Sequence, residues 1–315
     1  MNRARRVSPW GALLLFTGAL VSAALVTPAR GAPATRSVHD DTGDEVIVSA
    51  NGCRIVSLSP GTTAMLYAAG AGHCLVGTIA HSNEPAEAAS VPFVGDAETF
   101  DFERLLALRP TAVVVAIDVV QRVRIDRIRA LGIPVYQVHV TSLAQMPESL
   151  RRLGELTGSA AIAGPKAGEL RAALARLTAQ YRERTPVRVL YQIWDRPIYT
   201  IGGRHVISDA LRTCGARNIF SDLETAAPAV TREAALTRNP ELILVSAPPD
   251  SAGEWIAEWR KFPSVSAVRN GNLVPYADER MDRMGPSVID ATARLCEVID
   301  RARLPPGAGK ASAGQ

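Results

Sequence analysis

Short, continuous apolar runs alternate with amphipathic segments along most of the chain. The runs at residues 54–59, 112–117 and 135–138 are rich in β-branched residues, which is typical of parallel strands covered on both faces. Segments with helical spacing at residues 62–70 and 121–131 lie between them. This alternation predicts an α/β fold built on parallel, helix-covered sheets.

The pattern changes between residues 159 and 184. Leu170, Leu174, Leu177 and Tyr181 recur at helical spacing among charged and small residues, which predicts one long helix with a solvated face. Pro165 marks either the start of this helix or a kink in it. Beyond the helix the alternation resumes, with predicted elements at residues 187–192, 208–213, 232–237, 242–246 and 287–302.

The two halves resemble each other. Glu103 to Pro110 and Glu233 to Pro240 each run from a glutamate to a proline seven positions on, each precedes an apolar run, and the two lie 130 residues apart. We therefore predict two similar lobes joined by the long helix, with a ligand cleft between them. The expected divisions are an N-terminal lobe at 45–147, a linker with the long helix at 148–185, a C-terminal lobe at 186–303 and a disordered tail at 304–315.

The N-terminus has the layout of an export signal. Arg3, Arg5 and Arg6 precede an apolar run at residues 10–26, and small residues follow to Ala34. Polar residues interrupt the run, which leaves it short for a membrane anchor of ~20 residues. We predict that residues 1–34 are a cleaved signal peptide and that the mature protein is soluble in the periplasm.

Removing this segment changes the charge. The chain has 35 Lys and Arg against 31 Asp and Glu, and four of the arginines lie in residues 1–34. The mature chain is thus close to neutral and has no basic cluster, so nothing electrostatic suggests a nucleic-acid partner. We expect a monomer.

Four cysteines are present, which allows three pairings. Cys53 and Cys74 flank one strand–helix unit, whereas Cys214 and Cys296 both lie in the second half. We expect disulfides 53–74 and 214–296, as suits an exported chain. A site of four thiolates binding a metal is the alternative, although no CxxC pair supports it.

Catalytic signatures are missing from the sequence. It has no nucleophile elbow, Walker loop, HExxH motif or dinucleotide-binding glycine pattern. Only five histidines occur in the sequence. We therefore expect no enzymatic activity, no cofactor and no resident metal, which disfavours a chelatase-like enzyme and a metal-ion binder.

Several segments, in order, resemble one family. They include "RIVSLSP", "FERLLALRP", "TREAALTRNPELILV" and "RMGP", and they are similar to the helix-linked periplasmic binding proteins of importers for cobalamin, haem and ferric siderophores. The stretch "YQIWDRPIYTIGGRHVISDALRTCGARNIF" resembles the cobalamin-binding branch, where cysteines corresponding to Cys214 and Cys296 also occur. The resemblance implies capture of cobalamin or a related corrinoid, and its delivery to an ABC permease and ATPase complex at the inner membrane. Haem or a ferric siderophore is the alternative cargo.

The resemblance also assigns docking residues. In the family, one glutamate on each lobe contacts arginines of the permease, and the matching residues here are Glu103 and Glu233. The alternative is that each is an acidic residue of a first helical turn, which the helix dipole favours. Many relatives carry a glutamate where this chain has Ala64.

The resemblance implies a ligand cleft lined with aromatic residues, and this chain has fewer of them at the matching positions than the family does. Tyr191 and Trp194 supply aromatic area. Arg283 either bonds amides or carboxylates of the ligand, or forms a surface ion pair with Asp282 or Glu279. His81 is either an axial ligand or an exposed loop residue, and His205 is a further candidate. Three alanines stand where the best-known cobalamin binder has tryptophans: Ala97, Ala116 and Ala227.

Overall fold

Two β-sheets carry the fold, one in each lobe. The structure, a computed structural model, describes residues 34–96, 99–117 and 120–304, so the predicted signal peptide and most of the predicted tail lie outside the described residues. The first sheet is wholly parallel and has the strand order β4-β3-β5-β6. Its strands are β3 Ile55–Ser57, β4 Leu75–Gly77, β5 Ala112–Ala116 and β6 Val135–Val138. The three strands predicted at residues 54–59, 112–117 and 135–138 are therefore confirmed, each within two residues at either end.

The second sheet has a parallel centre and an antiparallel edge. β7 Val187–Trp194, β11 Leu242–Val245 and β12 Leu273–Pro275 run parallel. β8 Ile198–Thr200 returns along β7 through a short turn, and a short turn can join only antiparallel strands. The sheet is completed by β9 Ala216–Asn218, parallel to β7, and β10 Ala229–Val230, antiparallel to β8. The predicted parallel sheet is thus confirmed for β7, β9, β11 and β12, and an antiparallel edge formed by β8 and β10 adjoins it.

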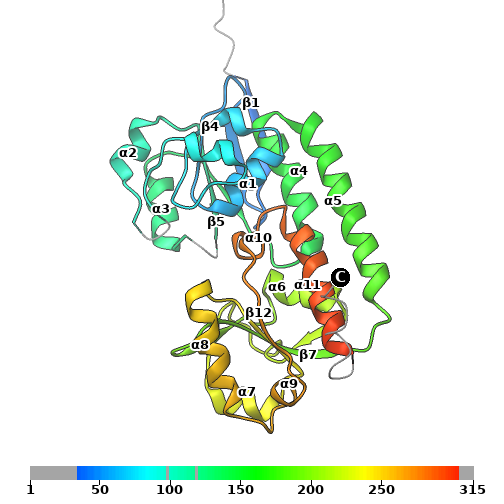
Figure 1. Cartoon of the computed structure of the whole chain (residues 1–315). Coiled ribbons are helices and arrows are strands. Elements are labelled where there is room, and N and C mark those ends of the chain that lie inside the picture. The colour runs from blue at the N-terminus through cyan, green and yellow to red at the C-terminus, as the bar shows by residue number, and fades with distance from the viewer. Residues whose placement is uncertain (1–33, 97–98, 118–119, 305–315) are drawn as a thin grey trace, which may run out of the picture. The chain divides into compact units, whose positions relative to one another are not determined.

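The connection between the lobes consists of two antiparallel helices rather than one. α5 Ala160–Tyr181 is the predicted long helix, and α4 Met146–Thr157 packs along it (Figure 1). Pro165 lies within α5, so it does not mark the start of the helix. Gly158 ends α4 with a φ of 80°, a conformation that glycine adopts without strain.

The remaining elements flank the sheets. α1 begins at Pro60, and its N-cap is Ser59, whose side chain accepts from the Thr62 amide. The helix therefore begins two residues before the predicted segment 62–70, because proline is favoured at the first helical position. The other helices are α1 Pro60–Ala68, α2 Phe102–Ala107, α3 Arg122–Ala130, α6 Val206–Thr213, α7 Arg232–Arg238, α8 Pro249–Arg260, α9 Ser266–Arg269, α10 Glu279–Arg283 and α11 Val288–Arg303; β1 Thr35–His39 and β2 Glu45–Ser49 form a hairpin.

One apolar core runs through both lobes. Val114 of β5 and Leu244 of β11 belong to the same cluster of buried residues, together with residues of α1, α4, α5, α6 and α11. The neighbouring Val113 and Ile243 point to the opposite faces of their sheets and belong to two separate outer clusters. This alternation is the reason for the continuous apolar runs in the sequence, since each strand is covered on both faces. The predicted lobe boundaries stay predictions.

Both expected disulfides are present. Cys53 is bonded to Cys74 and Cys214 to Cys296, and no cysteine is free. The alternative of a metal site with four thiolates is therefore wrong, because a sulfur in a disulfide is not available as a thiolate ligand. Within the described residues, none of the helices has both the length and the apolar character that a membrane span requires.

The two disulfides differ in access, and this predicts the order in which they are reduced. Cys53 is half-buried, whereas Cys214 and Cys296 are both 0% exposed. A mild phosphine reductant followed by iodoacetamide should label Cys53 and Cys74 first, as read by peptide mass spectrometry, because exchange requires access to a sulfur. Labelling of Cys214 should require denaturant, and its loss from the native state should reduce the free energy of unfolding by about 2–5 kcal/mol. Equal labelling of both pairs in native protein would contradict this order.

Candidate ligand-binding site

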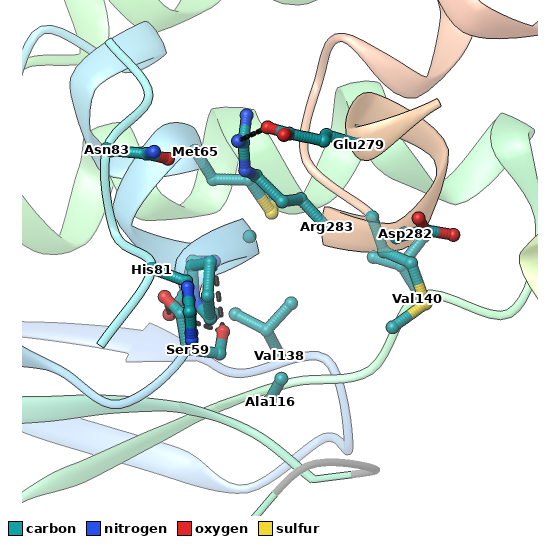
Figure 2. A pocket seen from close by; sticks show the side chains of 14 residues that line it. Ser59, Met65, His81, Asn83, Ala116, Val138, Val140, Glu279, Asp282 and Arg283 are labelled. Atoms are coloured by element: carbon teal, nitrogen blue, oxygen red, sulfur yellow. Dashed lines mark hydrogen bonds and ion pairs between the residues drawn. The ribbon is translucent and has the colours of Figure 1, made fainter. Parts of the chain in front are cut away.

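A pocket of about 390 Å³ lies where the first sheet meets the C-terminal segment 279–284. Ala116 and Val138 are the last residues of β5 and β6, so the pocket lies at the carboxyl ends of parallel strands, as is usual in open α/β sheets. Figure 2 shows Ala116 and Val138 on one side of the pocket and Arg283 on the opposite side. The lining residues are Ser59, Pro60, Gly61, Thr62, Met65, His81, Asn83, Ala116, Val138, Val140, Glu279, Asp282, Arg283 and Met284.

A network of buried hydroxyl groups supports one wall of the pocket. The Ser57 and Thr62 hydroxyls are 2.7 Å apart, and the Thr63 hydroxyl donates to Ser57 Oγ at 2.9 Å. Ser59 caps α1 and lines the pocket. Because these hydroxyls satisfy one another, the N-terminal turn of α1 is a preorganised wall.

His81 lies at the edge of this pocket, as the family resemblance implied. It follows β4 in a loop and has a φ of 65°, a left-handed conformation that is uncommon for residues other than glycine. Its side chain is exposed and close to Ser59 in Figure 2. His81 thus lines the pocket, and both its contact with a ligand and axial ligation by its ring stay predictions.

Arg283 lines the same pocket but is not a surface residue. Its side chain is 16% exposed and forms two ion pairs, one with Glu279 and one with Glu84 at 3.0 Å. The pairing with Glu279 was predicted as an alternative. Glu84 was missed, because it lies 199 positions away in the sequence and no local pattern connects the two residues.

Asp282 faces the pocket from the same segment. Its carboxylate is open to solvent through the pocket, while protein surrounds it on most other sides. Burial, and then the neighbouring charge of Asp278, raise the pKa of Asp282 above its usual range. Together with Glu279, this side chain makes the mouth of the pocket acidic.

A second hollow, of about 250 Å³, adjoins the first. Asp282 and Met284 line both, and His205 lines only the second. His205 is the N-cap of α6, and its Nδ1 accepts from the Ile207 amide at 3.1 Å, which places the proton of the neutral ring on Nε2. The two predicted histidines thus lie in adjoining hollows.

The two predicted aromatic residues are not among the residues that line these two hollows. Tyr191 is 0% exposed and packs edge-on to Tyr276, with ring centroids 6.2 Å apart. Burial raises the pKa of its hydroxyl, so the side chain is a neutral core residue and not a lining residue. Trp194 is 55% exposed at the end of β7 and packs edge-on to Trp255 at 6.1 Å. Successive side chains along a strand point to opposite faces of the sheet, so Tyr191 and Trp194 of β7 lie on different faces. A match between sequence motifs does not show to which face a side chain points.

The three alanines that match tryptophan positions in the family resemblance do not lie together in one pocket. Ala116 lines the first pocket, and Ala227 is exposed in the loop before β10. Ala97 lies outside the described residues.

Glu103 and Glu233 occupy equivalent places in the two lobes. Each is the second residue of its helix, α2 or α7, after a capping side chain from Asp101 or Thr231. Both glutamates are exposed, and neither forms an ion pair within the described residues. The first-turn position expected from the helix dipole is therefore confirmed, and the docking role stays a prediction.

These features define a class of protein. Two α/β lobes share a continuous core, and one pocket is lined by residues from both halves of the chain, which is the arrangement of a two-lobed solute-binding protein. Residues 55–279 match the model of a family described as periplasmic binding protein, and the chain belongs to that family.

Named relatives cover most of the chain. The vitamin B12-binding protein of Photorhabdus laumondii subsp. laumondii is 30% identical over 247 residues, which is 78% of this chain and 88% of the relative. The crystal structure of the periplasmic vitamin B12-binding protein BtuF of Vibrio cholerae superposes with a TM-score of 0.72 at 28% identity, covering 79% of this chain and 97% of that one. The periplasmic heme-binding protein RhuT of Roseiflexus sp. RS-1 superposes with a TM-score of 0.69 at 21% identity, covering 81% and 100%, and at this identity the likeness shows the fold alone.

Proposed function

We propose that this protein captures cobalamin or a related corrinoid in the periplasm and delivers it to an ABC importer. The relatives near 30% identity are named for vitamin B12, which supports a corrinoid as the ligand. The charges that line the pocket are the observation that favours a corrinoid over haem. The protein then acts by binding and release, with no covalent chemistry.

The charge balance favours a ligand that is rich in amides. Arg283 is already compensated by Glu84 and Glu279, and Asp282 adds a further carboxylate. Haem carries two propionates, which would have to replace these carboxylates around Arg283 and lie beside Asp282, and like charges at short range are unfavourable. The amide groups on the rim of a corrin instead donate N–H bonds to carboxylates.

The apolar part of the lining suits the flat face of a macrocycle. Met65, Val138, Val140 and Met284 contribute apolar surface to the pocket, and Ala116 leaves room at the end of β5. Methionine side chains adapt their shape to a ligand surface, which offsets the lack of aromatic residues in the described lining.

Haem is the second candidate cargo, because His81 is exposed at the edge of the pocket and imidazole is a common axial ligand of haem iron.

Titration of the exported protein with cyanocobalamin, haemin and a ferric hydroxamate by calorimetry tests the choice of cargo. We expect cyanocobalamin to bind at least about tenfold more tightly than haemin, equivalent to ~1.4 kcal/mol. A reversed order would replace the corrinoid by haem as the cargo.

Delivery is proposed to use Glu103 and Glu233. Two exposed charges, each held at the start of a helix in a different lobe, would steer and register a transient complex with basic residues of a permease. The continuous core through α4 and α5 would limit the movement of the lobes to a small hinge motion.

A further inference from the structure

Glu84 joins the first lobe to the C-terminal segment behind the pocket. Its Oε2 lies 3.0 Å from Nη1 of Arg283, and the two side chains are 29% and 16% exposed. Glu84 is not among the residues that line the ligand pocket; it lines a separate hollow on another side of α1, with Tyr67 and Ser287. The carboxylate therefore reaches Arg283 from the side away from the ligand.

The two ion pairs of Arg283, with Glu279 and with Glu84, differ in strength. Glu279 lies one turn away on the same short helix and is 81% exposed, so solvent screens its attraction. Glu84 is more sheltered, and screening by water falls with burial. A ligand at the mouth of the pocket can displace Glu279 from the guanidinium, whereas Glu84 stays in place behind it.

The backbone holds Arg283 in position for this pairing. Its carbonyl oxygen packs against Gly61 of α1 so closely that a Cβ on Gly61 would lie 2.3 Å from it. Glu84 also belongs to the loop that places His81 and Asn83 in the pocket lining. One short loop thus contributes two residues to the pocket lining, and it also carries the carboxylate that is paired with Arg283.

We propose that Glu84 is the specificity-determining residue that makes the pocket select neutral, amide-bearing macrocycles over carboxylate-bearing ones. It neutralises Arg283 from behind, so the guanidinium has little net attraction for an anion. The N–H groups that do not donate to Glu84 can donate to carbonyl oxygens of a ligand. The inference rests on the proposed function, because it explains how this site would discriminate between corrinoids. Glu84 acts through Arg283 and is a positioning residue.

The test compares two probes that differ in one group: cyanocobalamin and its monocarboxylic acid, in which one amide is replaced by a carboxylate. For the wild type we expect the amide form to bind about tenfold more tightly. Glu84→Gln keeps the shape and removes the charge, and it should reduce this ratio of dissociation constants by about tenfold, while Glu84→Asp should restore it. Glu87→Gln is the matched control, since Glu87 is an exposed acid three residues further on, and its ratio should equal that of the wild type.

Equal loss of affinity for both probes in Glu84→Gln would show a merely structural role and overturn the inference, as would an unchanged ratio. If the wild type binds no corrinoid, the proposed function fails by itself. The same ratio is then measured with haemin dimethyl ester and haemin, and Glu84→Gln must still shift it about tenfold toward the carboxylate form. A wild type that binds none of the four probes overturns both proposals.

Discussion

Replacing Glu103 and Glu233 together by alanine is expected to abolish transport and to leave ligand affinity unchanged. Both carboxylates are exposed at the start of α2 and α7, and neither lies in the ligand pocket. Their loss should therefore act on association with the permease, where removing charges at an interface slows encounter and weakens the complex. Uptake of labelled cyanocobalamin into vesicles that contain the importer should fall at least about hundredfold, equivalent to ~2.7 kcal/mol.

The matched control replaces two other exposed glutamates, Glu183 and Glu254. Their side chains are 85% and 70% exposed, and each is paired only with a neighbouring arginine. This variant carries the same change in net charge and should transport at the wild-type rate. If Glu103→Ala with Glu233→Ala instead weakens ligand binding, or if the control loses transport equally, the docking role is wrong.

The second large effect is expected at Gly61. An added Cβ would lie 2.3 Å from the Arg283 carbonyl oxygen and 3.3 Å from that of Met284, and both contacts are with backbone atoms that cannot rotate away. Gly61→Ala should therefore separate α1 from the segment that carries Arg283. We expect a loss of about 2 kcal/mol in the free energy of unfolding, as for other overpacked sites, and weaker ligand binding.

Urea unfolding followed by circular dichroism measures this loss, and Gly253→Ala is its control. Gly253 lies inside α8, with open space within 4 Å of the position of its Cβ. Alanine there should be neutral or should stabilise the helix by about 0.5–1 kcal/mol. Equal stabilities for the two variants would show that the contact between α1 and α10 is loose.

Much of the fold was predictable because local physical chemistry decides it. The strands β3, β5 and β6 follow from continuous β-branched runs, and α5 follows from apolar residues at helical spacing. α4 is absent from the sequence prediction although its residues have an amphipathic pattern, because residues 148–157 are assigned there to the linker without a helix of their own. α8 was missed as well, since it begins with prolines that also mark turns.

The site was predictable only in part. The motif near the C-terminus led to Arg283, and the loop after β4 led to His81. Tyr191 and Trp194 were chosen for aromatic area, but one is in the core and the other lies at an exposed strand end. Glu84 carries no signal in the sequence, since its role depends on a partner 199 residues away.

The sequence by itself determined the α/β class, the duplicated halves and the two disulfide pairs, because these rest on local periodicity or on position along the chain. It also determined the family, through motifs that resemble those of known members. Only the tertiary structure decided that a single core runs through both lobes and that Arg283 meets Glu84. The physical reason is that charge compensation and close packing depend on distances in space. Residues far apart in the chain come within a few ångströms only after the sheets, α4 and α5 have packed together.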